Sequence, residues 1–168
     1  MNAAAIQILE RTPGTLRGLL GQATTEDLDW RPAPDRWSIS MVLAHLADVE
    51  GNGFVARFRA MVGQEDPFLP SYDQLALFAA GRAWDGTAEL TRLEAERLRT
   101  LEFLRTLPAE AGSRRGRHEQ LGPITVAELL NEFAFHDLGH LRQLAELYRA
   151  RVFYPSMGAF RNYYQIHP

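Results

Sequence analysis

Apolar residues recur at three- and four-residue steps in four stretches of the chain, which is the spacing of one face of an α-helix. The stretches cover residues 3–20, 39–62, 87–107 and 123 to about 148. Polar and charged residues occupy most of the positions between the apolar ones. The pattern therefore predicts four amphipathic helices, each of which buries one face.

Residues that start or stop helices mark the ends of these stretches. Ser38 is a favoured N-cap for the second helix, and Pro108 ends the third. We expect Pro123 to open the fourth helix as a first-turn proline, and Pro155 to follow its end. Pro13 removes one backbone donor inside the first helix, so a kink or a restarted helix is expected there.

The connections between the predicted helices are long. Residues 21–37 are rich in proline and turn-forming residues, and their tryptophans are expected to pack this segment onto the helices. Residues 63–84 contain two prolines and have room for a short helix at 72–80. Residues 109–122 are interpreted as a polar loop, and residues 153–168 as a tail too aromatic to lie free in solvent.

No strand pattern, internal repeat or low-complexity tract is evident in the sequence. Four amphipathic helices joined by long connections predict an all-α fold, a four-helix bundle that forms a single domain over residues 1–168. The long connections permit a crossover, so the residues leave open whether the helices run up-down-up-down or up-up-down-down.

Composition narrows the class of protein. The chain has 168 residues, of which 46% are hydrophobic and 23% charged, and this argues against disorder. A net charge of −3 offers no general attraction for nucleic acid or anionic membranes. The absence of cysteine excludes disulfides and thiolate ligands and fits a cytoplasmic location. Neither a signal peptide nor a membrane span is predicted.

Three histidines are the candidate functional residues. His136 and His140 are four residues apart, so on a helix they project from one face, and both fall within the apolar arc. His45 lies at the border of the apolar stripe of the second helix. If the two helices are neighbours, three imidazoles can hold one divalent transition metal and leave coordination positions open for catalysis. Imidazole favours zinc, nickel, copper, iron or cobalt over calcium or magnesium. We expect zinc or nickel, with iron, manganese or cobalt as alternatives.

Other polar residues fall on the predicted inner faces. Glu50 and Arg97 either pair across the core or face a cavity, where with Asn52 they would contact a substrate. Asp137 either orients a histidine or pairs with a neighbouring helix. The sequence between the two nearby histidines is His-Asp-Leu-Gly-His, so it lacks the glutamate general base of an HExxH motif. Two other histidines are weaker candidates for a functional site. His118 lies among arginines in a predicted loop, where it could contact an anion, and His167 is next to the C-terminus.

Three blocks of the chain resemble the DinB-like (DinB/YfiT) superfamily of bacterial four-helix-bundle proteins. They are residues 37–50, which contain His45, residues 121–130 at the start of the last helix, and residues 134–143, which follow the family's His-Asp-x-x-His-x-x-Gln pattern. Residues 28–34 agree as well. The resemblance covers nearly the whole chain in the family's order and spacing.

The resemblance implies an up-down-down-up bundle, a divalent-metal site at His45, His136 and His140, and a homodimer. Relatives include thiol-dependent S-transferases and a mycothiol-dependent isomerase, and many have no known reaction. We therefore expect a metal-dependent enzyme of transferase or hydrolase type that acts on a small molecule. The alternatives are a non-catalytic metal-binding or stress-related interaction module, and a purely structural bundle with histidines in its core.

Overall fold

A computed structural model describes residues 2–79, 81, 83–166 and 168 and shows four long helical segments within them. The segments are α1 (Ala3–Leu20), the run from Ile39 to Gly63, α6 (Gly86–Thr106) and α7 (Val126–Tyr148). Each corresponds to one of the stretches with helical spacing. The predicted four-helix bundle is therefore confirmed.

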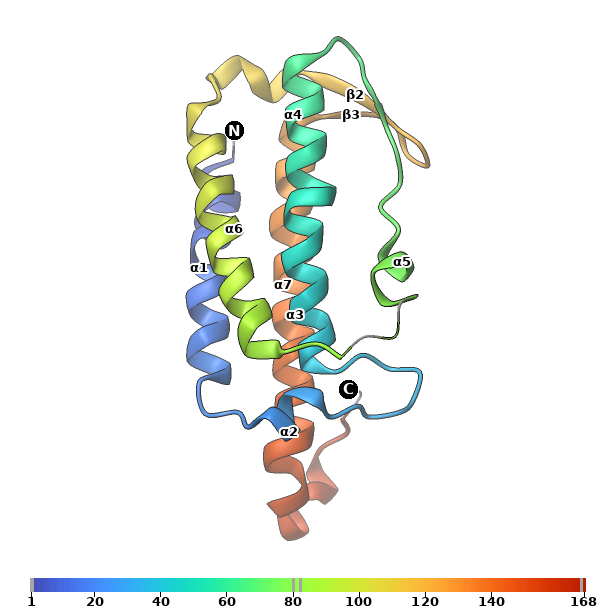
Figure 1. Cartoon of the computed structure of the whole chain (residues 1–168). Helices are drawn as coiled ribbons and strands as arrows, with labels where there is room; N and C mark the ends of the chain where they lie inside the picture. Colours follow the sequence, from blue (N-terminus) through green and yellow to red (C-terminus); the bar gives the residue numbers. More distant parts are fainter. Residues whose placement is uncertain (1, 80, 82, 167) are drawn as a thin grey trace.

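The direction of each helix can be followed in Figure 1. Helix α1 descends, the segment from Ile39 to Gly63 ascends, α6 also ascends, and α7 descends. The second and third segments run parallel because residues 64–85 return along the length of the bundle before α6 begins. The order is the up-down-down-up topology that the family resemblance implies.

Helix α1 passes through Pro13 as one helix, so the predicted restart is absent. Pro13 has no N–H to give to the carbonyl of Leu9, four residues earlier. That carbonyl accepts a hydrogen bond from Nη1 of Arg97 on α6 instead, at 2.7 Å. The proline therefore leaves an acceptor that a neighbouring helix uses.

The second helical segment has a π-helical turn in its middle. Helix α3 (Ile39–Val49) is followed by the π-helix η1 (Glu50–Val55) and then by α4 (Ala56–Gly63). Ser38 caps α3 as predicted, because its hydroxyl accepts a hydrogen bond from the backbone N–H of Met41. Apolar spacing predicts the whole segment but not the π-turn, whose first residue, Glu50, is buried.

Two short helices lie in the long connections. Helix α2 (Thr25–Asp29) begins with a capping box between Thr24 and Asp27. Helix α5 (Gln74–Ala79) fits the space that the sequence leaves for a short helix at 72–80, and Ala80 lies outside the described residues. The ring of Trp37 packs 4.8 Å from that of Phe78 on α5, so the two connections meet each other.

A small sheet contradicts the expectation that the chain has no strands. Strands β1 (Phe68–Leu69), β2 (Arg115–His118) and β3 (Gly122–Thr125) pair in the order β1-β2-β3, with β1 parallel and β3 antiparallel to β2. The predicted polar loop at 109–122 is mainly this hairpin, after the 3₁₀-helix η2 (Ala109–Ser113). Strands of two to four residues are too short to show alternation.

The start of the last helix also differs from the prediction. Pro123 lies in β3, and α7 begins at Val126 after the N-cap Thr125, which forms a capping box with Glu128. Strand β3 is at the edge of the sheet, where a proline costs no ladder hydrogen bond. The threonine cap, rather than the proline, sets the first turn of α7.

The aromatic tail is more exposed than expected. After α7 the chain continues through η3 (Arg149–Phe153), η4 (Tyr154–Ser156) and η5 (Gly158–Tyr163). The exposed fraction is 66% for Phe160 and 82% for Tyr163, so in the single chain these rings face solvent, contrary to the expectation that the tail is too aromatic to lie free. In Figure 1 this segment extends below the other helices, which therefore do not cover it.

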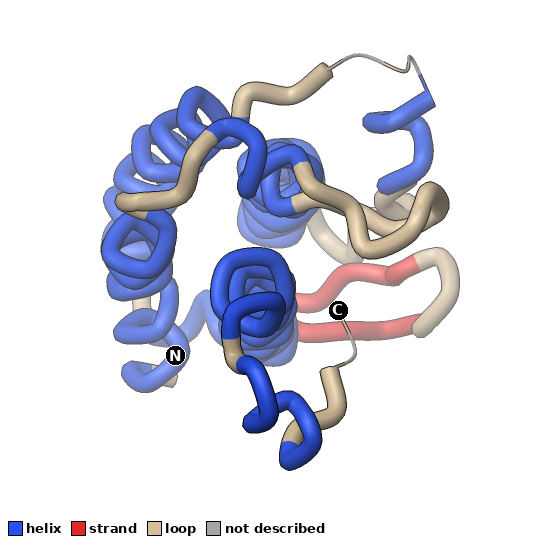
Figure 2. Tube along the Cα trace, turned by 90° about the horizontal axis from the view of Figure 1, so that it is seen from below, coloured by secondary structure: helices blue, strands red, loops and turns tan. Residues whose placement is uncertain are grey.

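Two large apolar clusters fill the bundle, and a smaller one contains Met41, Ala44 and Trp84. The first large cluster contains Leu9, Phe54 and Phe133 and reaches the sheet through Leu69 of β1. The other contains Leu16, Leu43, Leu93 and Leu144. Figure 2 shows the hairpin beside the helices rather than between them. Among the described helices, none has both the length and the apolar character that a membrane crossing requires.

Candidate metal centre

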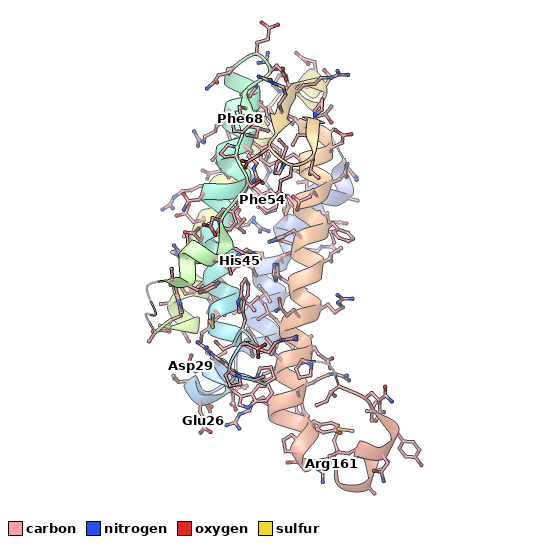
Figure 3. All side chains as sticks on the ribbon, turned by 90° about the vertical axis from the view of Figure 1, so that its right-hand side faces the viewer. Glu26, Asp29, His45, Phe54, Phe68 and Arg161 are labelled. Atoms are coloured by element: carbon pink, nitrogen blue, oxygen red, sulfur yellow. The ribbon has the colours of Figure 1, made fainter. Side chains whose placement is uncertain are left out.

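The three predicted histidines meet between α3 and α7. Nε2 of His136 lies 3.2 Å from Nε2 of His45 and 3.2 Å from Nε2 of His140. One ligand atom from each residue falls within 4.8 Å of the other two. Figure 3 labels His45 at mid-height of the bundle, between the helices that carry the three residues.

The spacing of these nitrogens suits a common metal ion. Two imidazole nitrogens bound to one tetrahedral zinc at about 2.05 Å lie about 3.3 Å apart. The amide oxygen of Gln143 is 2.8 Å from Nδ1 of His140 and only accepts hydrogen bonds, so Nδ1 carries the proton. Nε2 of His140 therefore presents a lone pair towards His136. In the absence of an ion, the 3.2 Å contacts are hydrogen bonds whose donor depends on the tautomers, whereas a cation between the rings would accept a lone pair from each Nε2.

Burial keeps the imidazoles neutral, which is the form that binds metals. Desolvation and the neighbouring His140 lower the pKa of His45 to about 4. Desolvation and the other two histidines lower the pKa of His136 to about 3. Burial also lowers the pKa of His140. At neutral pH all three rings are ready to act as ligands.

Packing rather than hydrogen bonding orients two of the rings. Nδ1 of His45 and Nδ1 of His136 are buried and have no hydrogen-bond partner among the described residues. The ring of His45 lies 5.3 Å from that of Trp37 and 5.9 Å from that of Tyr72. The ring of His136 meets the face of Phe54 edge-on at 5.3 Å. The direction of these imidazoles therefore depends on how their helices are placed.

A buried ionic cluster lies beside the histidines. Arg97 donates two hydrogen bonds to Glu50, two to Asp137 and one to the carbonyl of Leu9, at 2.7 to 3.1 Å. All five N–H groups of the guanidinium are thus satisfied. The predicted pairing of Glu50 with Arg97 is confirmed. Asp137 pairs with a neighbouring helix, which was one of its two predicted roles.

The other candidates are not part of the group of three imidazoles. Arg97 and Glu50 are only 2% and 1% exposed, so they lie in the core rather than on a substrate-accessible surface. Asn52 is exposed and bonds to Asp48 at 3.0 Å, at the rim of a hollow of about 210 Å³ beside residues 68–73. His118 is in β2, and His167 lies outside the described residues.

An open hollow of about 790 Å³ runs along the outer side of α7 and has His136, His140 and Gln143 in its wall. Its charged residues have both signs and are Arg36, Glu132, Arg142, Glu146 and Arg149. Glu132 precedes His136 by one helical turn. Burial raises the pKa of its carboxyl, against the nearby charge of Arg57. The two half-buried ligands, His136 and His140, therefore border a space that a small molecule can enter.

Sequence reasoning assigned no role in this site to Gln143 or Glu132, although Gln143 closes the His-Asp-x-x-His-x-x-Gln pattern of the family. Gln143 follows His140 by three residues and Glu132 precedes His136 by four, so helical spacing alone places them beside the ligands. Neither residue was considered as a site residue, because the search was confined to polar residues within the apolar arc of each helix. The role of Gln143 also depends on a hydrogen bond that only the structure shows.

A family model described as the DinB superfamily matches residues 8–144. The "Putative metal-dependent hydrolase YfiT" of Bacillus subtilis is 28% identical over 147 residues, which are 86% of this chain and 82% of that protein. A protein of Oceanobacillus iheyensis with the same description is 26% identical over 144 residues, covering 84% of this chain and 83% of that protein.

A solved structure shares the architecture. It matches with a TM-score of 0.78 and 26% identity, over 89% of each chain. It is described with the words "YfiT from Bacillus subtilis is a probable metal-dependent hydrolase with an unusual four-helix bundle topology". The order of helices here agrees with a bundle that departs from the simple up-down-up-down arrangement.

Proposed function

The chain belongs to the DinB superfamily, and from this premise we propose that it is a metal-dependent hydrolase of a small molecule. His45, His136 and His140 are the proposed ligands of a divalent transition metal, with zinc or nickel preferred by imidazole donors. The observation that carries the proposal is the convergence of three Nε2 atoms beside an open hollow of about 790 Å³. The descriptions of the two relatives support the same reaction class.

When bound, a divalent ion supplies Lewis-acid chemistry and lowers the pKa of a bound water. The chain supplies the rest. The three neutral imidazoles would hold the ion, and the hollow next to His136 and His140 would admit the substrate. Glu132 in its wall is the proposed acceptor of the proton that leaves the attacking water, because it lines the same hollow as His136 and His140 and precedes His136 by one helical turn.

The test joins metal analysis with turnover. Purified protein is measured for bound metal and assayed on a panel of esters, amides and phosphoesters, before and after removal of the metal with a chelator. His140→Ala removes a ligand, and His118→Ala is the matched control on the sheet. The expected result is hydrolysis that disappears with the metal and in His140→Ala, but not in His118→Ala.

Each other outcome points elsewhere. If the protein carries no metal and adding zinc or nickel does not shift its melting temperature, the metal site and the hydrolase proposal both fail. Metal-dependent turnover that requires a thiol acceptor indicates an S-transferase. If the protein binds metal but turns over no substrate, with or without an added thiol, the non-catalytic alternative is favoured.

We also propose a homodimer. Phe135 and Leu138 on α7 are 78% and 47% exposed, and the aromatic tail that follows the helix is exposed as well. An apolar surface of this kind on one side of a molecule is typical of an interaction site. Light scattering after size exclusion should give twice the mass of the chain, and Phe135→Glu should shift the species to the monomer.

A further inference from the structure

The ligands come from two separate helices, and the structure shows what joins those helices. His45 lies on α3, five residues before Glu50, the first residue of η1, and His136 is next to Asp137 on α7. Arg97 on α6 donates hydrogen bonds to the carboxylate of Glu50 from Nε and Nη2, both at 2.8 Å. It also donates hydrogen bonds to the carboxylate of Asp137 from Nη1 and Nη2, at 2.7 and 3.1 Å. One planar guanidinium therefore contacts both segments that carry the ligands.

The geometry of this contact is restrictive. Two-pronged pairs between a guanidinium and a carboxylate fix direction as well as distance. The fifth N–H of Arg97 is bonded to Leu9 on α1, so the side chain has no free donor with which to rearrange. A rotation of α3 or α7 about its axis breaks at least one of these pairs. Arg97 therefore fixes the rotation of each ligand helix relative to the other.

An aromatic contact continues from Arg97 to one ligand. The guanidinium carbon lies 4.9 Å from the centre of the Phe133 ring. Phe133 stacks on Phe54 with 3.9 Å between ring centres and an angle of 7° between their planes. The face of Phe54 meets the His136 ring. Since Nδ1 of His136 has no hydrogen-bond partner among the described residues, this packing holds the imidazole in place.

We propose that Arg97 is a positioning residue for the metal centre, one that holds His45 and His136 at metal-binding distance by clamping Glu50 and Asp137. This inference rests on the proposed metal site. It assigns the buried cluster a role beyond stability, and it does not require Arg97, Glu50 or Asp137 to touch the ion or the substrate.

The test separates positioning from stability. A triple variant, Arg97→Met with Glu50→Leu and Asp137→Val, replaces the cluster with apolar groups, and such replacements often preserve or raise stability. The control is Leu104→Ala, a core truncation two turns away on α6 that lowers stability without touching the cluster. Zinc affinity is measured by competition with a chromophoric chelator, and ligand geometry from the visible absorption of the Co²⁺-loaded protein.

In the triple variant we expect a folded bundle, zinc affinity about 10- to 100-fold weaker than in the wild type, and altered Co²⁺ bands. In Leu104→Ala we expect wild-type affinity and bands despite a lower melting temperature. Wild-type affinity and bands in the folded triple variant overturn the inference. If the triple variant does not fold, the zinc affinity and Co²⁺ bands of Asp137→Asn are measured instead. Weaker affinity and altered bands in that variant support the proposal, and unchanged zinc affinity overturns it. If the wild type binds no metal, the proposed function itself fails.

Discussion

Gln143 provides a quantitative test of the metal centre because it makes the one hydrogen bond to an Nδ1 atom of the three histidines among the described residues. Gln143→Leu keeps the size of the side chain and removes the acceptor at 2.8 Å. The proton of His140 is then free to move to Nε2, which blocks the lone pair that binds metal. Loss of such a partner weakens metal binding about 10- to 100-fold, which is about 1.4 to 2.7 kcal/mol.

This loss has a thermal counterpart. A ligand present at 100 times its Kd stabilises the folded chain by about 2.7 kcal/mol. In a domain of this size 1 kcal/mol corresponds to about 2 to 4 °C. At that zinc concentration an affinity 10- to 100-fold weaker removes about 1.3 to 2.3 kcal/mol of this stabilisation. The zinc-induced rise in melting temperature should therefore be smaller in Gln143→Leu by about 3 to 9 °C. The melting temperatures of the metal-free proteins should differ by about 1 to 6 °C, because a single hydrogen bond contributes about 0.5 to 1.5 kcal/mol.

Calorimetric titration and thermal melts with and without zinc measure both quantities. Gln165→Leu is the matched control, since Gln165 borders the same hollow and is not bonded to a ligand histidine. Gln143→Glu should retain or increase affinity, because a carboxylate accepts the same proton more strongly. The reasoning is refuted if Gln143→Leu binds zinc as tightly as the wild type, or if Gln165→Leu weakens binding equally.

Three further predictions follow from the site and the fold. His140→Ala should abolish tight metal binding and leave the helical circular dichroism intact, because two ligands remain in a folded bundle; a collapse of helicity would make the metal structural. The metal-free chain should lose stability as pH falls from 7 to 5, since unfolded histidines take up protons near pH 6.5, whereas the folded pKa values of His45 and His136 are about 4 and 3; a flat urea midpoint, or one that rises, contradicts this. Gly116→Ala should cost about 1 to 3 kcal/mol, because the added Cβ would lie 2.8 Å from Cδ1 of Leu69, and an unchanged urea midpoint would show that Leu69 moves aside freely.

The sequence predicted the features that repeat along a helix. Apolar spacing located the four long segments and placed His136 and His140 on the inner side of the last one, because each signal extends over several turns. It also predicted the partnership of Glu50 with Arg97, since charged residues within an apolar arc require a partner. These inferences need only the local geometry of a helix.

Features that depend on contacts between distant segments were not predictable in the same way. The hairpin forms where Gly116 lets Leu69 and Met61 approach, and a four-residue strand has no distinctive pattern of its own. The expectation for the tail assumed that its aromatic rings would be buried against other residues, but the segment after α7 extends beyond the end of the bundle. The link from Arg97 to the Leu9 carbonyl required knowledge of which helix faces Pro13.

The ionic cluster also bears on the order in which the molecule is assembled. His45 and His136 are 91 positions apart, so a tight site exists only after the chain has folded. The cluster around Arg97 joins all four helical segments through protein groups alone. We therefore expect folding to be completed without an ion, in contrast to small zinc domains that are unfolded when empty. Uptake and release of the proposed metal would then be exchange events of a folded protein, with rates governed by access through the hollow beside α7 rather than by unfolding.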